Sequence, residues 1–385
     1  MNSKSILLLL FSSIFLFVHN EDYKSFIANL NLNLEEVQYT TDDRYVNTVW
    51  VLTSKDSSNR NGQSVILQHG LLDGGFTWLI LAENSLAKKL CDEGYVVYIS
   101  YIRGTQFSKS HLDYDTGLLS KYWDFSFDEM AEFDLPALIN LVKTRDNVEK
   151  VNYIGHSQGT LIFFLAYMNN PEFMEASIRK YVALGTVPNV NNAPHFLIKI
   201  FEKSKILNLI PVKNFLTFPD EIGQVLVPFC TSKAKILCDK ILSIAFGGLK
   251  DTGRIDYDKY GKNIFMYEPG GTSLQNMKHW IQIYTAKKAQ KYDYGMIENL
   301  IHYKSIYPPV YDLDKMKKYS IPSIMTISDS DPFCNPQDIL DFVDLIEDKN
   351  VVEILSLTDY NHIDYFWADS AVDDIFPKIL NFLGE

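Results

Sequence analysis

Short apolar runs alternate with helical stretches between residues 63 and 167. Each apolar run is four to six residues long and is bounded by polar or glycine positions, which is typical of a buried strand. The order strand, helix, strand, helix predicts a parallel sheet covered by helices on both faces. The expected strands are Ser64–Gln68, Tyr95–Ser100 and Val151–Ile154, and the expected helices are Ser85–Cys91, Ser126–Val142 and Thr160–Tyr167.

The expected helix at 126–142 carries its own start signal. Ser126 precedes Glu129 by three residues, which is the spacing of a capping box ahead of an apolar-periodic helix. Pro136 lies inside this segment, and a proline in a helix interior removes a hydrogen bond. We expect Pro136 to kink the helix or to mark its true start.

The regular alternation stops after residue 188 and returns near residue 308. Two further strand candidates, Ile321–Ile327 and Val351–Leu357, follow the interruption. The pattern predicts a core formed by residues 21–187 and 308–385, interrupted by an inserted cap and lid domain at 188–307. The fold class expected is α/β, a mostly parallel sheet flanked by helices, with a mainly helical insertion.

The N-terminus indicates the compartment. Lys4 precedes the apolar run Ile6–Val18, and the chain turns polar at His19. Thirteen residues are too few to span a bilayer comfortably, so residues 1–20 are predicted to be a signal peptide, with an uncleaved anchor as the alternative. The expected destination is the secretory pathway, either secreted or in a lysosomal or vacuolar lumen.

The net charge bears on the possible partners of the chain, and the cysteine content fits an oxidising compartment. The net charge is −12 and no run of Lys and Arg could follow a phosphate backbone, so nucleic-acid binding is excluded. Cys230 and Cys238 lie close together, and a disulfide between them would close a small loop in an oxidising lumen. Cys91 and Cys334 are isolated in sequence and are expected to be buried free thiols.

The segment Gly155-His156-Ser157-Gln158-Gly159 matches the G-x-S-x-G pattern between a strand and a helix. Its two glycines allow a tight turn that exposes the serine hydroxyl. The N–H of Gln158, at the helix start, would face a developing oxyanion. The alternative is a glycine-bounded turn whose serine only caps a helix.

A second oxyanion donor is expected upstream. His69-Gly70 follows the strand 64–68, and glycine there allows close backbone approach, so the N–H of Leu71 would complete the pair. His69 itself is expected to be structural.

A serine nucleophile needs a base and an orienting acid, which follow it in this chain order. His362, in the loop after the strand 351–357, is favoured over His302. Asp329 and Asp331 both follow the strand 321–327, and the residues alone do not separate them. Asp364 is expected to be structural. A metal site near residues 124–132 lacks His or Cys spacing, and nothing near Cys91 would activate its thiol, so both are set aside.

The chain resembles the acid lipases, the family of gastric lipase and lysosomal acid lipase. This resemblance implies an α/β-hydrolase core with a cap and mobile lid, and hydrolysis of triacylglycerols and sterol esters without a metal or other cofactor. The matching segments are LQHGLL at 67–72, FSFDEMAEFDLPALI at 125–139, YIGHSQGT at 153–160, GGTSLQNMKHW at 270–280 and YNHIDYFWA at 360–368.

Position by position, the resemblance implies Ser157 as nucleophile and His362 as base. The family's aspartate lies five residues before a proline, here Pro336, which selects Asp331 over Asp329. The oxyanion donors map to the backbones of Leu71 and Gln158, and the family's cap disulfide resembles the pair Cys230 and Cys238. The chain departs from the family at Ser328-Asp329-Ser330, where a second carboxylate could perturb titration, and at Arg103-Gly104-Thr105.

The function expected is a serine ester hydrolase of the lipase type that cleaves neutral-lipid esters, either triacylglycerol or sterol ester. A carboxylesterase or thioesterase on smaller soluble substrates is the first alternative, and a non-catalytic lipid-binding protein is the second. The cap, with apolar stretches such as Ala234–Phe246, is expected to contact a lipid–water interface transiently, and the protein is expected to be a monomer.

Overall fold

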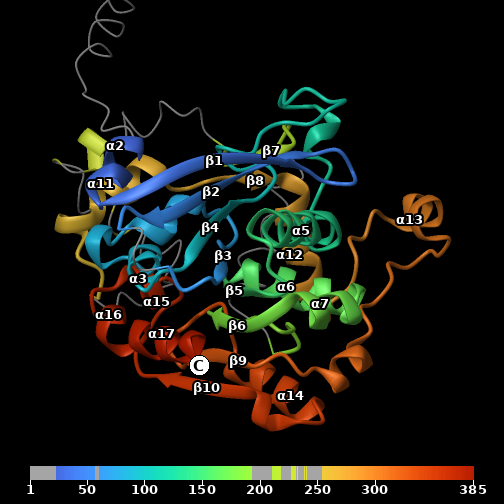
Figure 1. Ribbon diagram of the computed structural model, residues 1–385. Helices are drawn as coiled ribbons and strands as arrows, with labels where there is room; N and C mark the ends of the chain where they lie inside the picture. The colour runs from blue at the N-terminus through green and yellow to red at the C-terminus, as the bar shows by residue number, and fades with distance from the viewer. Residues whose placement is uncertain are drawn as a thin grey trace, which may run out of the picture.

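An eight-stranded, mostly parallel sheet runs through the centre of the molecule (Figure 1). Its order is β1-β2-β4-β3-β5-β6-β9-β10. The pairs β1/β2 and β2/β4 are antiparallel, and all other pairs are parallel. The strands are β1 (Leu32–Thr40), β2 (Val46–Ser54), β3 (Ser64–Gln68), β4 (Val96–Tyr101), β5 (Val151–His156), β6 (Ile178–Leu184), β9 (Ser323–Ser328) and β10 (Val352–Leu357).

The computed structural model describes residues 23–56, 60–192, 210–217, 227–230, 232, 238, 240 and 254–385. The predicted signal peptide at residues 1–20 lies outside the described residues, as does nearly all of the apolar stretch 234–246. Within the described part of the chain, no helix combines the length and the apolar character needed to cross a membrane.

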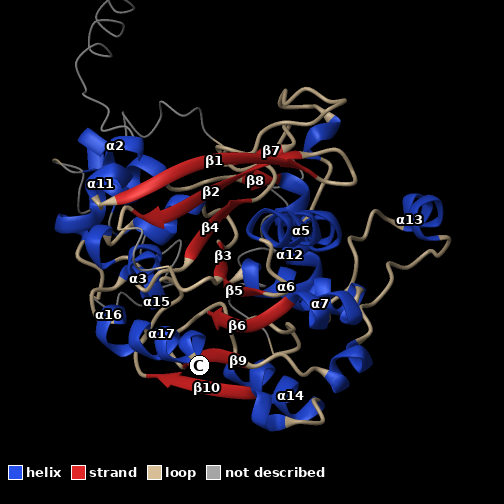
Figure 2. Ribbon diagram, viewed as in Figure 1, coloured by secondary structure: helices blue, strands red, loops and turns tan. Residues whose placement is uncertain are grey.

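Helices cover both faces of the sheet, as the alternation of strands and helices predicted (Figure 2). Strand β2 shows why: Val49 and Val51 pack into the hydrophobic cluster on one face, and Trp50 and Leu52 pack into the cluster on the other. One face carries α4 (Phe127–Glu129), α5 (Leu135–Asp146), α6 (Gln158–Asn169), α7 (Pro171–Ser177), α12 (Leu274–Ala286) and α14 (Pro336–Leu345); the other carries α2 (Tyr23–Asn29), α3 (Leu86–Asp92), α11 (Tyr257–Tyr267), α15 (Asp364–Trp367), α16 (Ala371–Asp374) and α17 (Phe376–Gly384).

The predicted strands and helices of the core are present, with ends moved by at most four residues. The predicted helix at 126–142 is a composite: α4 begins after a complete Ser126/Glu129 capping box, a π-helical turn follows at Met130–Asp134, and α5 then begins. Pro136 lies in the first turn of α5, so it marks the start of a helix, one of the two outcomes expected.

The antiparallel pair β1/β2 was not predicted. Strand β1 lies at the edge of the sheet, and only Leu32 and Tyr39 are buried along its nine residues. Glu35 and Glu36 occupy exposed positions of this strand, and charged side chains are common on edge strands because they discourage pairing with other chains. An edge strand of this kind has too weak an apolar pattern to stand out in the sequence.

The segment 188–307 contains more regular structure than its irregular pattern suggested. Its described residues include α11, α12, α13 (Met296–Tyr303) and a short ladder between β7 (Asn214–Phe215) and β8 (Thr272–Ser273). A disulfide joins Cys230 to Cys238. The side chains of Trp280, Ile283 and Tyr284 of α12 pack into the same hydrophobic cluster as α5 and α6. Part of the segment 188–307 thus packs against the helices that cover the sheet.

Arg103 anchors the loop after β4. Its guanidinium is completely buried, with forked contacts of 2.6–3.0 Å to Asp134 and 2.6 and 2.9 Å to Asp43. The ring of Tyr45 lies 3.8 Å from the guanidinium carbon. The segment Arg103-Gly104-Thr105 departs from the family pattern, but it keeps the arginine, and that arginine anchors the loop.

Replacing Arg103 is expected to lower stability strongly. Arg103→Met would leave the Asp134 carboxylate buried without its cation, at a cost of about 3–5 kcal/mol in the free energy of unfolding. Arg44→Met is the matched control, because the Arg44–Asp113 pair is exposed and should change stability by less than about 1 kcal/mol. Urea unfolding followed by circular dichroism would measure both; equal losses would contradict the assignment.

Candidate active site

Ser157 lies on a sharp turn between the end of β5 at His156 and the start of α6 at Gln158. Its backbone has φ +50° and ψ −116°, a strained conformation for a residue with a side chain. A Cβ on Gly159 would lie 2.6 Å from the carbonyl oxygen of Gln68, so only glycine fits there. The predicted strand–turn–helix context of the G-x-S-x-G segment is therefore present.

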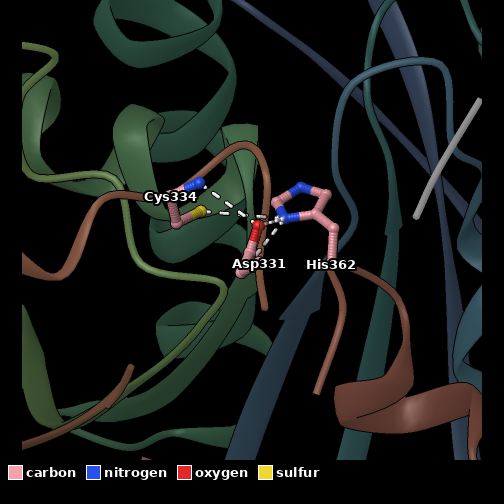
Figure 3. A group of neighbouring side chains, drawn as sticks. All are labelled: Asp331, Cys334 and His362. Carbon is pink, nitrogen blue, oxygen red and sulfur yellow. Dashed lines mark hydrogen bonds and ion pairs between the residues drawn. The ribbon is translucent and has the colours of Figure 1, made fainter. Parts of the chain in front are cut away.

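The structure brings Ser157, His362 and Asp331 together. The Oγ of Ser157 lies 2.7 Å from Nε2 of His362, and the opposite ring nitrogen, Nδ1, lies 3.0 Å from both carboxylate oxygens of Asp331. Figure 3 shows the imidazole of His362 facing this carboxylate. With Nδ1–H donating to Asp331, Nε2 is left to accept the serine proton, which is the arrangement of a nucleophile, a base and an orienting acid.

Four groups donate hydrogen bonds to the Asp331 carboxylate: His362, the N–H groups of Phe333 and Cys334, and the hydroxyl of Tyr365. Burial acts to raise the pKa of Asp331, but the facing His362 and these donors outweigh it and hold the pKa below its usual range. The structure thus distinguishes two aspartates that the sequence pattern left as alternatives. Asp331 is buried in contact with His362, and Asp329 is exposed.

Cys334 is a buried free thiol, as predicted, but its place beside the acid was not foreseen. Its Sγ lies 3.7 Å from Nδ1 of His362 (Figure 3), and burial followed by the Asp331 charge raises its pKa well above the usual range. Asp331, Cys334 and His362 are the one group among the described residues with donor atoms spaced for a metal ion. The Nδ1 and carboxylate atoms of that group already bond to each other.

Two residues fix the backbone of the His362 loop. His156 donates from Nε2 to the carbonyl oxygen of His362 at 2.7 Å, and Asp364 accepts from the N–H of Asn361 at 2.8 Å. Burial, with a contribution from His362, lowers the pKa of His156 well below its usual value, so its ring is neutral. Asp364 therefore has the structural place that the sequence indicated.

The two expected oxyanion donors lie beside the serine. A Cβ on Gly70 would be 3.1 Å from the Cβ of Ser157, which places Leu71 next to the nucleophile. Among the described residues, the N–H groups of Leu71 and Gln158 have no backbone acceptor, and a first-turn N–H has none within its helix. The next residue, Leu72, has φ +63°, a second strained position at the site.

His69 has the structural position expected of it. Its Nδ1 donates to the carbonyl oxygen of Gly70 at 2.9 Å, and its Nε2 accepts from the N–H of Ile102 at 3.3 Å. Burial lowers the pKa of His69 to about 4, so it is neutral near pH 7. The rejected candidates have no part in this relay: His302 is exposed on α13, and burial raises the pKa of the Cys91 thiol, which disfavours the thiolate.

Helix α12 holds the side chain of Gln158, a contact that was not predicted from the sequence. The Gln158 Oε1 accepts from Nδ2 of Asn276 at 2.9 Å and from Nε1 of Trp280 at 2.6 Å. Both donors come from α12. They lie within the segment GGTSLQNMKHW, whose similarity to the acid lipases was the available signal.

Comparisons with known proteins agree with this geometry. Residues 23–82 match a family described as a partial α/β-hydrolase lipase region, and residues 63–206 match the α/β-hydrolase fold. The gastric triacylglycerol lipase of Bos taurus is 34% identical, over 90% of this chain and 86% of that protein. The chain belongs to the gastric lipase family.

Other members of the gastric lipase family match over a similar length. The gastric triacylglycerol lipase of Homo sapiens is 32% identical, over 91% of this chain and 88% of that protein.

Solved structures share the fold at low sequence identity. A monoglyceride lipase from Saccharomyces cerevisiae, solved with a substrate analogue, has a TM-score of 0.54 at 15% identity, over 91% of this chain and 95% of that one. The predicted fold class and the predicted enzyme class, a carboxylic ester hydrolase of the lipase type, are confirmed.

Proposed function

We propose that this chain hydrolyses neutral-lipid esters, with Ser157 as nucleophile, His362 as general base and Asp331 as orienting acid. The observation that carries the proposal is the continuous relay from Ser157 Oγ to Nε2 of His362, and from Nδ1 to Asp331. The N–H groups of Leu71 and Gln158 form the oxyanion hole. All five residues were expected from the sequence.

The reaction proceeds in two halves. His362 takes the proton of Ser157 as Oγ attacks the ester carbonyl, and Asp331 stabilises the resulting imidazolium. The Leu71 and Gln158 N–H groups bind the oxyanion, each contributing about 3–4 kcal/mol to the transition state. His362 then protonates the departing alcohol, and water attacks the acyl-enzyme by the same steps in reverse.

The substrate proposed is a triacylglycerol or sterol ester at a lipid–water interface. Several relatives are named gastric triacylglycerol lipases, which supports a lipid substrate. We further propose that residues 188–307 act as a cap and lid that meets the interface, over a core of residues 21–187 and 308–385. The polar boundary after residue 18 supports a signal peptide and a secreted, lysosomal or vacuolar location, and the chain is proposed to act as a monomer.

Rates measured on either side of the substrate's solubility limit test this function. A short-chain triacylglycerol would be supplied at rising concentration, first dissolved and then emulsified. We expect the rate to rise sharply once emulsion droplets form, because the cap opens at an interface. Activity on the dissolved ester with no rise beyond saturation would contradict a lipase and favour a carboxylesterase. No hydrolysis at any concentration would favour a lipid-binding protein.

A further inference from the structure

Two buried carboxyl groups meet behind the oxyanion hole. Asp73 comes from the loop after β3, and Glu268 follows α11; they are 5% and 4% exposed. Both accept from the N–H of Gly74, at 3.1 Å to Asp73 Oδ1 and 3.0 Å to Glu268 Oε2, and the two carboxyl groups hydrogen-bond to each other. The reaction scheme above assigns neither residue a role.

The pair holds residues 70–74, here called the oxyanion loop. The Asp73 carboxylate accepts from the N–H of Gly74, at the C-terminal end of the loop. Gly270 donates from its N–H to the carbonyl oxygen of Leu72 at 2.8 Å. A Cβ on Gly270 would lie 2.5 Å from the carbonyl oxygen of Asp73, so the two backbones are in direct contact. The loop that presents Leu71 to Ser157 is thus fixed by residues 268–270.

The surroundings offer this pair no compensating cation. The Nδ1 of His156 lies 3.9 Å from Asp73, but burial keeps that ring neutral, and His69 is neutral as well. Thr77, Tyr101 and Tyr267 are the other polar side chains near the pair, and none of them carries a positive charge. Within the described residues, neither carboxyl group forms an ion pair with a lysine or arginine.

Two carboxylates in contact cannot both be ionised at low cost, so they share one proton. Burial, reinforced by Asp73, raises the pKa of Glu268 well above its usual value, and burial raises the pKa of Asp73 to about 6. Glu268 is therefore the donor and Asp73 the acceptor. A carboxyl group whose folded pKa is raised stabilises the fold at low pH, and that contribution is lost as the pH rises through the folded pKa.

We propose that the proton-sharing pair Asp73–Glu268 positions the oxyanion loop, so that loss of the shared proton displaces the Leu71 N–H from the reacting ester. The inference rests on the proposed function, because it concerns the same oxyanion hole. Neither carboxyl group is a catalytic residue; both act through the loop backbone. Hydrolysis should then fall on the alkaline side, where the pair loses its shared proton.

The pH profile of Glu268→Gln tests the inference. Glutamine keeps the shape of the protonated acid and a donor to Asp73 at every pH. The substrate is a dissolved p-nitrophenyl ester, so that no lipid interface contributes. From about pH 4 to about pH 9, we expect kcat/KM of the unmodified protein to fall at least about tenfold on the alkaline side, because one oxyanion donor is lost. Glu268→Gln should stay within about twofold of its maximum there.

Asp338→Asn is the matched control. Burial raises the pKa of Asp338 to about 6, as for Asp73, but Asp338 lies on α14 and bonds to Asn192. Its variant should keep the alkaline fall of the unmodified protein. Asp73→Asn provides a second test if Glu268→Gln does not fold, because it also removes the facing charges and should flatten the profile.

Two results would overturn the inference. An alkaline fall of equal size and midpoint in Glu268→Gln, Asp73→Asn and the unmodified protein would exclude the pair as its cause. An unmodified protein that hydrolyses the ester equally well across the range would do the same, while leaving the proposed function standing. Absence of hydrolysis at every pH would instead remove the proposed function and this inference together.

Discussion

Ser157→Ala is expected to reduce kcat for ester hydrolysis by about 10⁶-fold. The reason is that the hydroxyl at 2.7 Å from His362 Nε2 is the proposed nucleophile, and alanine leaves no atom to form the acyl-enzyme. Binding and the oxyanion donors remain, so residual hydrolysis of about 10³–10⁴ over the uncatalysed rate is expected. Purified protein assayed with a chromogenic ester would give the ratio.

A second serine serves as the control for Ser157→Ala. Ser177, at the end of α7, is also buried, and its hydroxyl accepts from Nζ of Lys143 rather than from any group of the relay. Ser177→Ala should keep kcat within about twofold while confirming that loss of a buried hydroxyl is tolerated. A Ser157→Ala protein that retained full esterase activity would refute the mechanism.

Asp331→Asn is expected to lower kcat by about 10⁴-fold. The asparagine is nearly the same size, but its amide nitrogen cannot accept from Nδ1–H of His362. The ring would then take the wrong tautomer, with the proton on Nε2 facing Ser157. The measurement is kcat for a soluble ester, with substrate affinity followed separately through KM.

Asp329→Asn is the matched control, because it makes the same chemical change two residues earlier in the chain. Asp329 is exposed, so its variant should retain kcat within about twofold. A large loss in Asp329→Asn with a small loss in Asp331→Asn would reverse the assignment. The comparison also tests whether the Ser328-Asp329-Ser330 departure has any effect on the reaction.

The parts of the site that lie in one short segment could be predicted from the sequence. The elbow at Ser157 is specified by a strand, two glycines and a helix within a few residues, and each has a direct conformational reason. The buried strands β3, β5 and β9 were recognisable because both of their faces are apolar. Asp331 could not be assigned in this way. The residues alone did not distinguish it from Asp329, and it was selected through the resemblance to the acid lipases.

The remaining parts depend on contacts between distant segments, which no local pattern reports. Glu268 meets Gly74 across 194 residues, and α12 reaches Gln158 across 118. Strand β1 was missed because an edge strand with few buried side chains has little periodicity. The burial that separates Asp331 from Asp329, and the position of Cys334, appear only when β9 and the His362 loop have packed together.

The distribution of the reactive groups along the chain has a consequence for biosynthesis. Ser157 and His362 are 205 residues apart, with Asp331 between them. At a synthesis rate of about 5–20 residues per second, the serine leaves the ribosome roughly 10–40 s before its base. Throughout that interval the nascent chain carries a serine with no means of activation, so an unfinished chain cannot hydrolyse the lipid esters around it.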